Sequence, residues 1–281
     1  MEEQSTKIGS ETIGFNRYKF LKSLLFDDLT DIEKEEIRLY EERHEVTPEQ
    51  LKFKKDYIER ITTPEATIEF QITKKWLWDN FLLNYKEINK KDFIQTPETL
   101  ENIKAIMFYF LKDEKFFECV NVNPLSKPSF DKGLLLVGNY GNGKTSVMTA
   151  VEKTLKGIKG YHFRTYNTKE VVKLFESITA ESELTKRDFD NKMNYGVKLF
   201  DDLKAERDAS NFGKVNLISE ILEIRYVNKM KTHATMNYKQ GFAGDVEKAV
   251  DEIAEKYGDR VYDRMYEMFN IVEFKGKSFR I

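Results

Sequence analysis

The stretch GLLLVGNYGNGKT, from Gly133 to Thr145, decides the fold of this chain of 281 residues. Its first half is a run of apolar residues typical of a buried strand, and its second half is rich in glycine and ends in Lys144 and Thr145. The residues from Gly138 onward match the pattern G-x-x-x-x-G-K-[ST], in which the backbone N–H groups of the loop surround a phosphate. A helix is expected to begin at Lys144, so its positive N-terminus would face the same phosphate.

The loop places one cation and one hydroxyl where they would meet a bound polyphosphate. We expect the ammonium of Lys144 to reach the β- and γ-phosphates and the hydroxyl of Thr145 to bind Mg²⁺. The predicted nucleotide ligands are the loop and the residue after it, namely Gly138, Asn139, Tyr140, Gly141, Asn142, Gly143, Lys144, Thr145 and Ser146. A nucleotide site is therefore the first functional prediction, although a kinase, a GTPase and a motor would each contain such a loop.

Around this loop, short apolar runs alternate with helical patterns, which is the order of a parallel sheet covered by helices. Strands are expected at residues 134–137, 161–165, 197–200, 232–236 and 271–274. Helices are expected at residues 144–155, from 168 onward, at 214–228 and at 245–268. The predicted fold class is α/β, with a five-stranded and mainly parallel sheet.

Polar residues stand at the ends of two of these strands. Asp201 and Asp202 follow the strand at 197–200, and Asn237 follows the strand at 232–236. Asp201 would hold Mg²⁺ through water, and Asp202 would orient or deprotonate the attacking water. Asn237 would reach the γ-phosphate or the same water. Alone, two such acids are as typical of a solvated turn, and the asparagine is also common in a turn at a strand end.

Two arginines near the end of the chain form a further candidate. Arg260 and Arg264 are four residues apart, so they lie on one face of the expected helix. One interpretation is local pairing with Asp259 or Asp263. The other is an arginine finger, which stabilises charge on a phosphoryl group during its transfer.

The residues before the loop are predicted to be helical. Residues 1–16 are polar and are expected to be disordered. Thr-Pro-Glu triplets at 47–49, 63–65 and 96–98 each fit a helix start, and Thr30 with Glu33 forms a capping box for a helix to about His44. Core positions are expected in a helix at 97–111 and in a helix before it, namely Leu100, Ile103, Met107, Phe110, Trp76, Leu77, Phe81 and Leu83.

Composition excludes several classes of protein. The net charge of −2 gives no global basic field, although residues 131–281, with 26 basic and 23 acidic side chains, are the more basic half. The single cysteine, Cys119, excludes an internal disulfide and a multi-cysteine zinc site. The longest apolar run, Ala105–Leu111, is too short to cross a bilayer, and the acidic start is unlike a secretory signal. We expect a cytoplasmic protein without a membrane partner.

Taken in order, the P-loop, "LFDDL", "ATMN" and "YGDRVYDRM…VEFKGKSFR" resemble the AAA+ ATPases of the DnaC/DnaI helicase-loader and IstB transposition-helper group. The resemblance covers roughly residues 91–281 and implies an AAA+ domain that lacks a C-terminal helical lid. It implies ATP and Mg²⁺ as cofactors, with Thr145 and Asp201 at the metal. It assigns catalytic roles to four residues, Asp202 as the second Walker B acid, Asn237 as sensor 1, Arg264 as the arginine finger offered to a neighbouring subunit, and Arg260 as a second basic residue on that face.

The resemblance implies a replicative helicase loader that hydrolyses ATP, forms a homo-oligomer when ATP is present and touches single-stranded DNA. The resemblance does not extend to residues 1–90, which are expected to be helical and to bind the helicase or another DNA-processing protein. Contact with DNA is expected from Lys153, Lys156, Lys159, Lys169 and Lys173.

Two alternatives stay open at this point. One is a transposition helper that binds duplex DNA and activates a transposase. The other is an interaction switch that binds ATP and hydrolyses little of it, because Asp202 is one methylene shorter than the glutamate that often stands at this position.

Overall fold

The computed structural model describes residues 15–22, 29–43, 72–179, 185–210 and 213–279, which belong to two compact units, Met1–Phe70 and Gln71–Ile281. The helix starts predicted at 47–49 and 63–65 lie outside the described residues, as do residues 1–14. No helix in the described ranges is long and apolar enough to span a membrane.

In the first unit, the described residues form two helices, α1 (Phe15–Lys22) and α2 (Asp31–Arg43). The rings of Tyr18 and Tyr40 stack with their centroids 4.3 Å apart, and the Tyr18 hydroxyl donates a hydrogen bond to Glu41. The predicted capping box is present, since the Glu33 carboxylate accepts from the Thr30 backbone N–H at 3.0 Å. The predicted helix from this box therefore forms, and Phe15 and Asn16, expected to be disordered, begin α1.

The second unit begins with α4 (Lys74–Asn89) and α5 (Pro97–Leu111). We expected the ATPase domain to start near residue 91, but α4 packs against α6 and belongs to the same unit. Its residues Leu77 and Phe81 are buried in one core with Val147 and Val151 of α6. Two predicted core positions are wrong, because Leu83 is 68% exposed and Leu100 is 39% exposed; each lies on the outer side of its helix.

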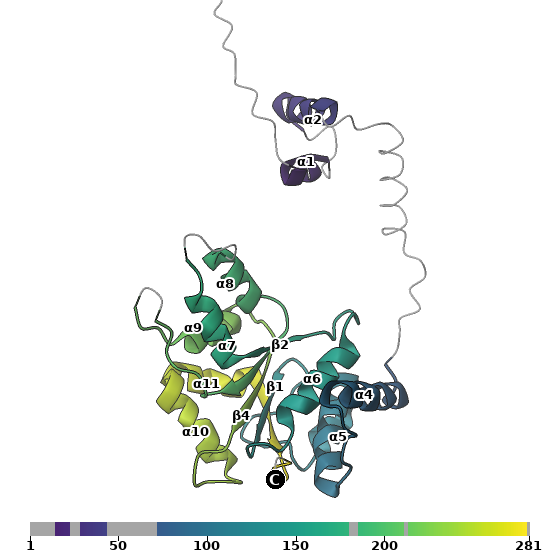
Figure 1. The fold of residues 1–281 in the computed structure, drawn as a ribbon, viewed down its shortest axis with the longest axis vertical. Coiled ribbons are helices and arrows are strands. Elements are labelled where there is room, and N and C mark those ends of the chain that lie inside the picture. Colours follow the sequence, from purple (N-terminus) through teal and green to yellow (C-terminus); the bar gives the residue numbers. More distant parts are fainter. Residues whose placement is uncertain (1–14, 23–28, 44–71, 180–184, 211–212, 280–281) are drawn as a thin grey trace, which may run out of the picture. The chain divides into compact units, whose positions relative to one another are not determined.

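A five-stranded parallel sheet in the order β2-β3-β4-β1-β5 forms the centre of this unit (Figure 1). The strands are β1 (Gly133–Gly138), β2 (Arg164–Asn167), β3 (Lys198–Leu203), β4 (Thr232–Asn237) and β5 (Phe269–Phe274). Every residue of β1 is buried, because β1 lies between β4 and β5 and both of its faces are covered by helices. The predicted α/β class is confirmed.

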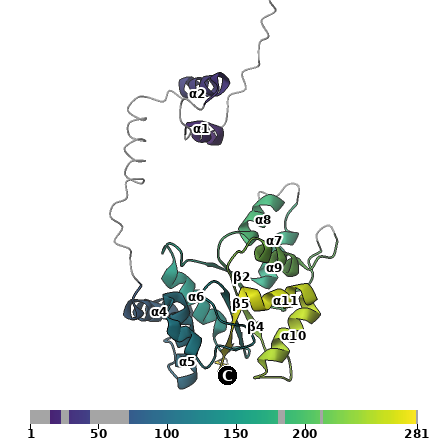
Figure 2. The ribbon, with the colours of Figure 1, turned by 180° about the vertical axis from the view of Figure 1, so that it is seen from behind.

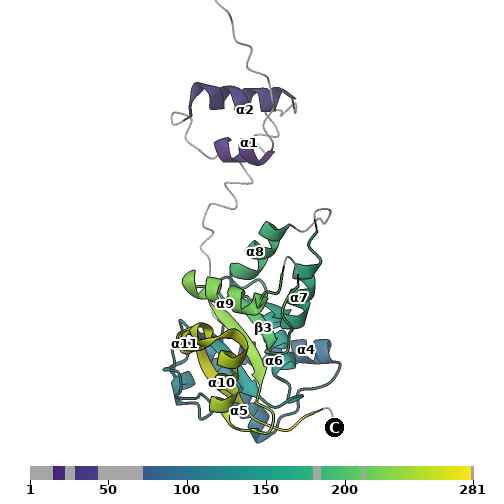
Figure 3. The ribbon, with the colours of Figure 1, turned by 90° about the vertical axis from the view of Figure 1, so that its left-hand side faces the viewer.

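Helices cover the two faces of the sheet in separate layers (Figures 1 and 2). Leu134 and Leu136 of β1 pack in the core with α4, α5 and α6 (Lys144–Leu155), and Leu135 and Val137 pack in the core on the other side. The second layer contains α7 (Thr168–Glu176), α8 (Lys186–Asn194), α9 (Leu217–Val227), α10 (Val246–Tyr257) and α11 (Asp259–Met268). Figure 3 shows the layer of α10 and α11 from outside. A short 3-10 helix, Glu114–Glu118, follows α5.

Three local predictions differ from the structure. The strand expected at 161–165 is β2 at 164–167, because the backbone turns at Gly160 and the Tyr161 N–H bonds back to Ile158. The helical pattern at 245–268 is interrupted at Gly258, whose φ of 88° separates α10 from α11. Helix α8 was not expected, since its sequence is mostly polar; Thr185 and Asp188 begin it with a capping box.

Candidate functional site

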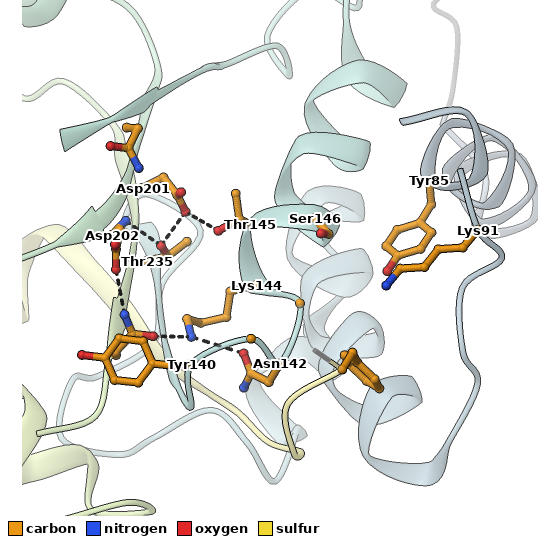
Figure 4. A pocket seen from close by; sticks show the side chains of 15 residues that line it. Tyr85, Lys91, Tyr140, Asn142, Lys144, Thr145, Ser146, Asp201, Asp202 and Thr235 are labelled. Carbon is orange, nitrogen blue, oxygen red and sulfur yellow. Dashed lines mark hydrogen bonds between the residues drawn. The ribbon is translucent and has the colours of Figure 1, made fainter. Parts of the chain in front are cut away.

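The carboxyl ends of β1, β3 and β4 meet at one edge of the sheet, where a pocket of about 380 Å³ opens (Figure 4). In open parallel sheets this edge is where ligands bind. The lining residues are Tyr85, Lys91, Tyr140, Gly141, Asn142, Gly143, Lys144, Thr145, Ser146, Asn167, Asp201, Asp202, Thr235, Asn237 and Phe279. The structure therefore brings the predicted loop together with both acids and the asparagine, residues that are about 60 and 100 positions away in the sequence.

Two glycines of the loop meet specific geometric demands. A Cβ atom on Gly138 would lie 2.2 Å from the Phe274 carbonyl oxygen and 2.7 Å from the Asn142 side chain, so only glycine fits between β1 and β5. Gly143 has a φ of 97°, in the region that glycine occupies at little cost, and α6 begins at the next residue. The chain thus turns sharply from β1 into α6, and the first residues of the helix, Lys144, Thr145 and Ser146, line the pocket.

Lys144 is 6% exposed, and the three N–H groups of its ammonium are shared among four acceptor oxygens that join the loop to the end of β4. The acceptors are the carbonyl oxygens of Gly138 at 3.0 Å and Asn139 at 2.8 Å, and the side-chain oxygens of Asn142 at 3.2 Å and Asn237 at 3.0 Å. Asn142 in turn donates to the Phe274 carbonyl at 2.6 Å, which ties the loop to β5. From this position between the loop and the end of β4, the ammonium would contact the outer phosphates of a nucleotide bound in the pocket.

Thr145 and Asp201 form a pair of oxygen ligands. The Thr145 hydroxyl donates to an oxygen of Asp201 at 2.8 Å, and the Thr235 hydroxyl donates to the same oxygen at 2.7 Å (Figure 4). A hydroxyl beside one carboxylate suits Mg²⁺, which takes its other ligands from phosphates and water. No cluster of three or more His, Cys, Asp and Glu side chains that could hold a metal alone occurs in the part of the chain that is described.

An irregularity in β3 determines the direction of the Asp202 side chain. Its φ is 64°, and the pairing of β3 with β4 shifts register between Phe200 and Leu203. The resulting bulge turns the Asp202 carboxylate toward the amide of Asn237, which donates to it at 2.7 Å. Both acids therefore lie inside β3, whereas we expected the strand to end before them.

Sequence reasoning missed five residues that line the pocket: Thr235, Asn167, Tyr85, Lys91 and Phe279. Thr235 had a signal, since it precedes Asn237 by two positions in a strand and so shares its face. Asn167 is the last residue of β2, and its side chain caps α7. The other three come from α4, from the segment after it and from the residues after β5, and no local motif marks them. Figure 4 shows Tyr85 and Lys91 across the pocket from Asp201.

Arg260 and Arg264 do not line this pocket. Among the ion pairs of the described residues, neither arginine pairs with Asp259 or Asp263; instead both guanidinium groups approach Glu223 of α9, at 3.6 Å and 3.1 Å respectively. The Arg264 guanidinium also lies 4.7 Å from the ring centre of Tyr226. Within one chain, the two arginines are therefore held on the face formed by α9 and α11.

A parallel sheet with a phosphate-binding loop after a central strand defines an α/β protein of the P-loop class. Among solved structures, the chain is similar to the DnaC helicase loader, with 24% identity, a TM-score of 0.49, and coverage of 72% of this chain and 100% of that one. It is similar to a putative primosome component from Streptococcus pyogenes serotype M3, with 21% identity, a TM-score of 0.44, and coverage of 67% and 85%. It is also similar to DnaI, with 20% identity, a TM-score of 0.44, and coverage of 73% and 95%.

No protein-family model matches the chain. A comparison with curated proteins finds no match.

Proposed function

We propose that this protein is an AAA+ ATPase that binds ATP with Mg²⁺, hydrolyses it slowly, and loads a replicative helicase. The ATPase proposal rests on one observation: the loop, Asp201, Asp202 and Asn237 all line the same pocket. A phosphate cradle alone would serve many functions. Here the loop is joined by the buried Asp201 beside the Thr145 hydroxyl and by Asp202 beside the Asn237 amide. These groups are suited to hydrolysing a phosphoanhydride bond.

Each side chain has a role that follows from its position. Lys144 binds the outer phosphates, and its bond to Asn237 would hold that amide near the γ-phosphate. Thr145 and Asp201 hold Mg²⁺, which neutralises phosphate charge when bound. Asp202 accepts a proton from, or orients, the attacking water, and Asn237 keeps the Asp202 carboxylate in place through its amide.

The role in helicase loading is proposed from the order of the four sequence elements, together with the separate unit formed by α1 and α2. That unit presents the exposed acidic side chains of α2 and the 70% exposed Ile32, which suits contact with another protein. We propose that the first unit, residues 1–70 of the expected 1–90, provides the helicase contact, since α4 belongs to the second unit. We also propose that ATP drives homo-oligomer formation through the face that carries Arg260 and Arg264.

A basic groove supports contact with single-stranded DNA. It has a volume of about 570 Å³ and lies beside β2 and α6, with Lys153, Lys156, His162, Arg164 and Lys198 in its lining. Burial, then the charges of Arg225, Arg164 and Lys192, lower the pKa of Lys198, so a phosphate there would relieve repulsion. Two of the five lysines predicted to contact DNA line this groove; Lys159, Lys169 and Lys173 do not.

The test measures ATP hydrolysis by the full chain alone, with single-stranded DNA, and with DNA plus the replicative helicase from the same source. Turnover that rises with the helicase, together with helicase delivery onto closed circular single-stranded DNA, is the expected result. The Lys144→Ala variant controls for contaminating ATPases.

A different outcome would favour one of the alternatives. Capture of a transposase by the Asp202→Asn variant, with binding of duplex DNA, would replace the helicase-loader proposal with the transposition helper. The short Asp202 side chain, already bonded to Asn237, is the observation that favours an ATP-dependent switch. Tight ATP binding, with turnover that stays at background when DNA and helicase are present, would support that switch.

A further inference from the structure

Lys204 has a backbone conformation that lysine rarely adopts. Its φ is 71°, and it comes two residues after Asp202, whose φ is 64°. The other residues of this kind in the described ranges, apart from glycine, are Lys90, Lys112 and Lys229, which all lie just after helices, where this conformation commonly ends a helix. Among the described residues other than glycine, only Asp202 and Lys204 adopt it at the end of a strand. Such strain persists where the surrounding contacts favour it.

The side chain of Lys204 makes those contacts. It is 13% exposed, and its ammonium donates to the carbonyl oxygens of Asn237 at 3.2 Å and Ala249 at 3.3 Å and to the carboxylate of Glu252. Its backbone N–H donates to the Tyr257 hydroxyl at 2.8 Å. One residue therefore joins the end of β3 to the end of β4 and to α10.

We propose that Lys204 is a positioning residue for ATP hydrolysis that acts through Asn237. This inference rests on the ATPase activity proposed above and adds a residue to its machinery. The ammonium holds the backbone of Asn237 by its carbonyl oxygen, and charge-assisted hydrogen bonds of this kind are stronger than neutral ones. The Asn237 side chain then spans from Lys144 to Asp202, with its oxygen on the first and its amide on the second.

A purely structural tie is the competing explanation, since Lys204 and Glu252 form a partly buried ion pair. The two explanations predict different kinetics. A structural tie lowers stability and leaves turnover per folded molecule unchanged. A positioning residue lowers kcat by a much larger factor than it changes the KM for ATP, because Lys144 and the loop still bind the phosphates.

The experiment compares Lys204→Met with Lys204→Arg in the full chain. Methionine keeps the length and the backbone strain but lacks the ammonium, and we expect kcat to fall about 10-fold or more, since a misplacement of about 1 Å can cost on the order of 100-fold. Arginine should restore part of the rate. The matched control is Lys229→Met, an exposed lysine whose φ of 52° is similar and which lies outside the pocket lining; it should leave kcat unchanged.

A double-mutant cycle identifies the route of the effect. In the Asn237→Ala background, Lys204→Met should cause no further loss, because the side chain through which Lys204 acts is already gone. A loss that is as large in this background as in the wild type would overturn the proposal. So would an unchanged kcat in a folded Lys204→Met protein, with folding checked by thermal melting.

Failure of the ATPase proposal would look different. If the wild type shows no turnover with DNA and helicase, the same four proteins of the cycle are compared for their affinity for a non-hydrolysable ATP analogue relative to ADP. Lys204→Met should then reduce the preference for the triphosphate in the wild-type background and not in the Asn237→Ala background. An equal preference in all four proteins would overturn the role of Lys204.

Discussion

Two regions of the second unit differ in how their charged residues are held. One is the edge of the sheet that carries the proposed nucleotide pocket, called the nucleotide edge below, and the other is the face formed by α9 and α11. At the nucleotide edge, Lys144, Asp201, Asp202 and Asn237 bond to one another and to the loop within one chain. On the α9–α11 face, Arg264 and Arg260 approach only one carboxylate, that of Glu223, among the ion pairs of the described residues. The side chains of the proposed nucleotide site therefore contact one another within the monomer, whereas the two arginines lie outside that pocket. Under the proposed function, they would act on the nucleotide of a neighbouring subunit.

The largest effect is expected from Lys144→Ala, which tests whether the nucleotide edge is a binding site at all. The variant removes charge-assisted hydrogen bonds to phosphate worth roughly 1.5–3 kcal/mol each, so ATP affinity should fall by about 100-fold or more. Hydrolysis should fall to background. Binding is measured with a fluorescent ATP analogue, and circular dichroism checks the fold.

The matched control for that variant is Lys75→Ala, which removes a lysine whose side chain is 86% exposed and which lies outside the pocket lining. It should bind ATP as the wild type does. If Lys144→Ala also binds ATP normally, the loop does not hold phosphate, and the nucleotide edge is not a binding site for ATP.

Arg264→Ala tests the other region. An arginine finger contributes about 10³-fold or more to turnover, so this variant should bind ATP normally and hydrolyse it poorly. Arg187→Ala, on the exposed side of α8, is the matched control. Mixing Arg264→Ala with Lys144→Ala should restore some activity, because in random assembly about 1/4 of interfaces pair an intact loop with an intact arginine.

Recovery on mixing requires that the two variants assemble together, which size-exclusion chromatography of the mixture checks first. If they assemble and no activity returns, Arg264 acts within its own subunit or only braces α11 against Glu223. That result would contradict the division between a monomeric binding site and an arginine supplied by a neighbour.

Asp202→Asn is expected to have the next largest effect. The amide keeps the shape of the side chain but cannot accept a proton, and general bases contribute about 10²–10⁴-fold. The variant should bind Mg-ATP and lose about 99% of its turnover, as measured by phosphate release; Asp190→Asn on α8 is the control. Turnover equal to that of the wild type would leave Asp202 as a bulge residue and place the base elsewhere.

The motif made the loop and its partners predictable, because a strand, a glycine-rich turn and a helix leave one place for the lysine and the hydroxyl. The α/β class followed from apolar runs that alternate with helical patterns. The bulge at Asp202 was not predictable, since it depends on the pairing of β3 with β4, which are 28 residues apart. Tyr85 and Phe279 reach the pocket through packing across the whole unit, which local patterns do not encode.

The start of the second unit also differs from the prediction, for a related reason. The residues of α4 show a helical pattern, but only the core shared with α6 reveals that this helix belongs to the second unit. The pairing of Arg264 with Glu223 joins two helices that are 41 residues apart at the contact. Nearby acids in the sequence were the natural candidates, and the fold brought a distant one closer.

The smallest effect concerns β4, the strand that carries Asn237 at its far end. His233 is buried, and burial, followed by the charges of Lys231 and Arg225, lowers its pKa to about 3. Its Nδ1 accepts a hydrogen bond from the Leu134 N–H at 3.0 Å, which joins β4 to β1. The neutral imidazole is therefore the form that fits the fold.

The direction of the pH effect follows from proton binding. The unfolded chain, with an ordinary histidine pKa of about 6.5, takes up a proton as the pH falls below that value, while the folded chain does not until about pH 3. Stability due to His233 is thus present above about pH 6.5 and is lost as the pH falls, by about 2 kcal/mol between pH 7 and pH 5. Urea unfolding at several pH values measures this loss. The slope should be smaller in His233→Asn, whose side-chain oxygen can still accept from Leu134, and unchanged in His162→Asn, where the histidine is exposed. If all three proteins lose stability equally, His233 is not what makes the β1–β4 pairing, and with it the nucleotide edge, sensitive to acid.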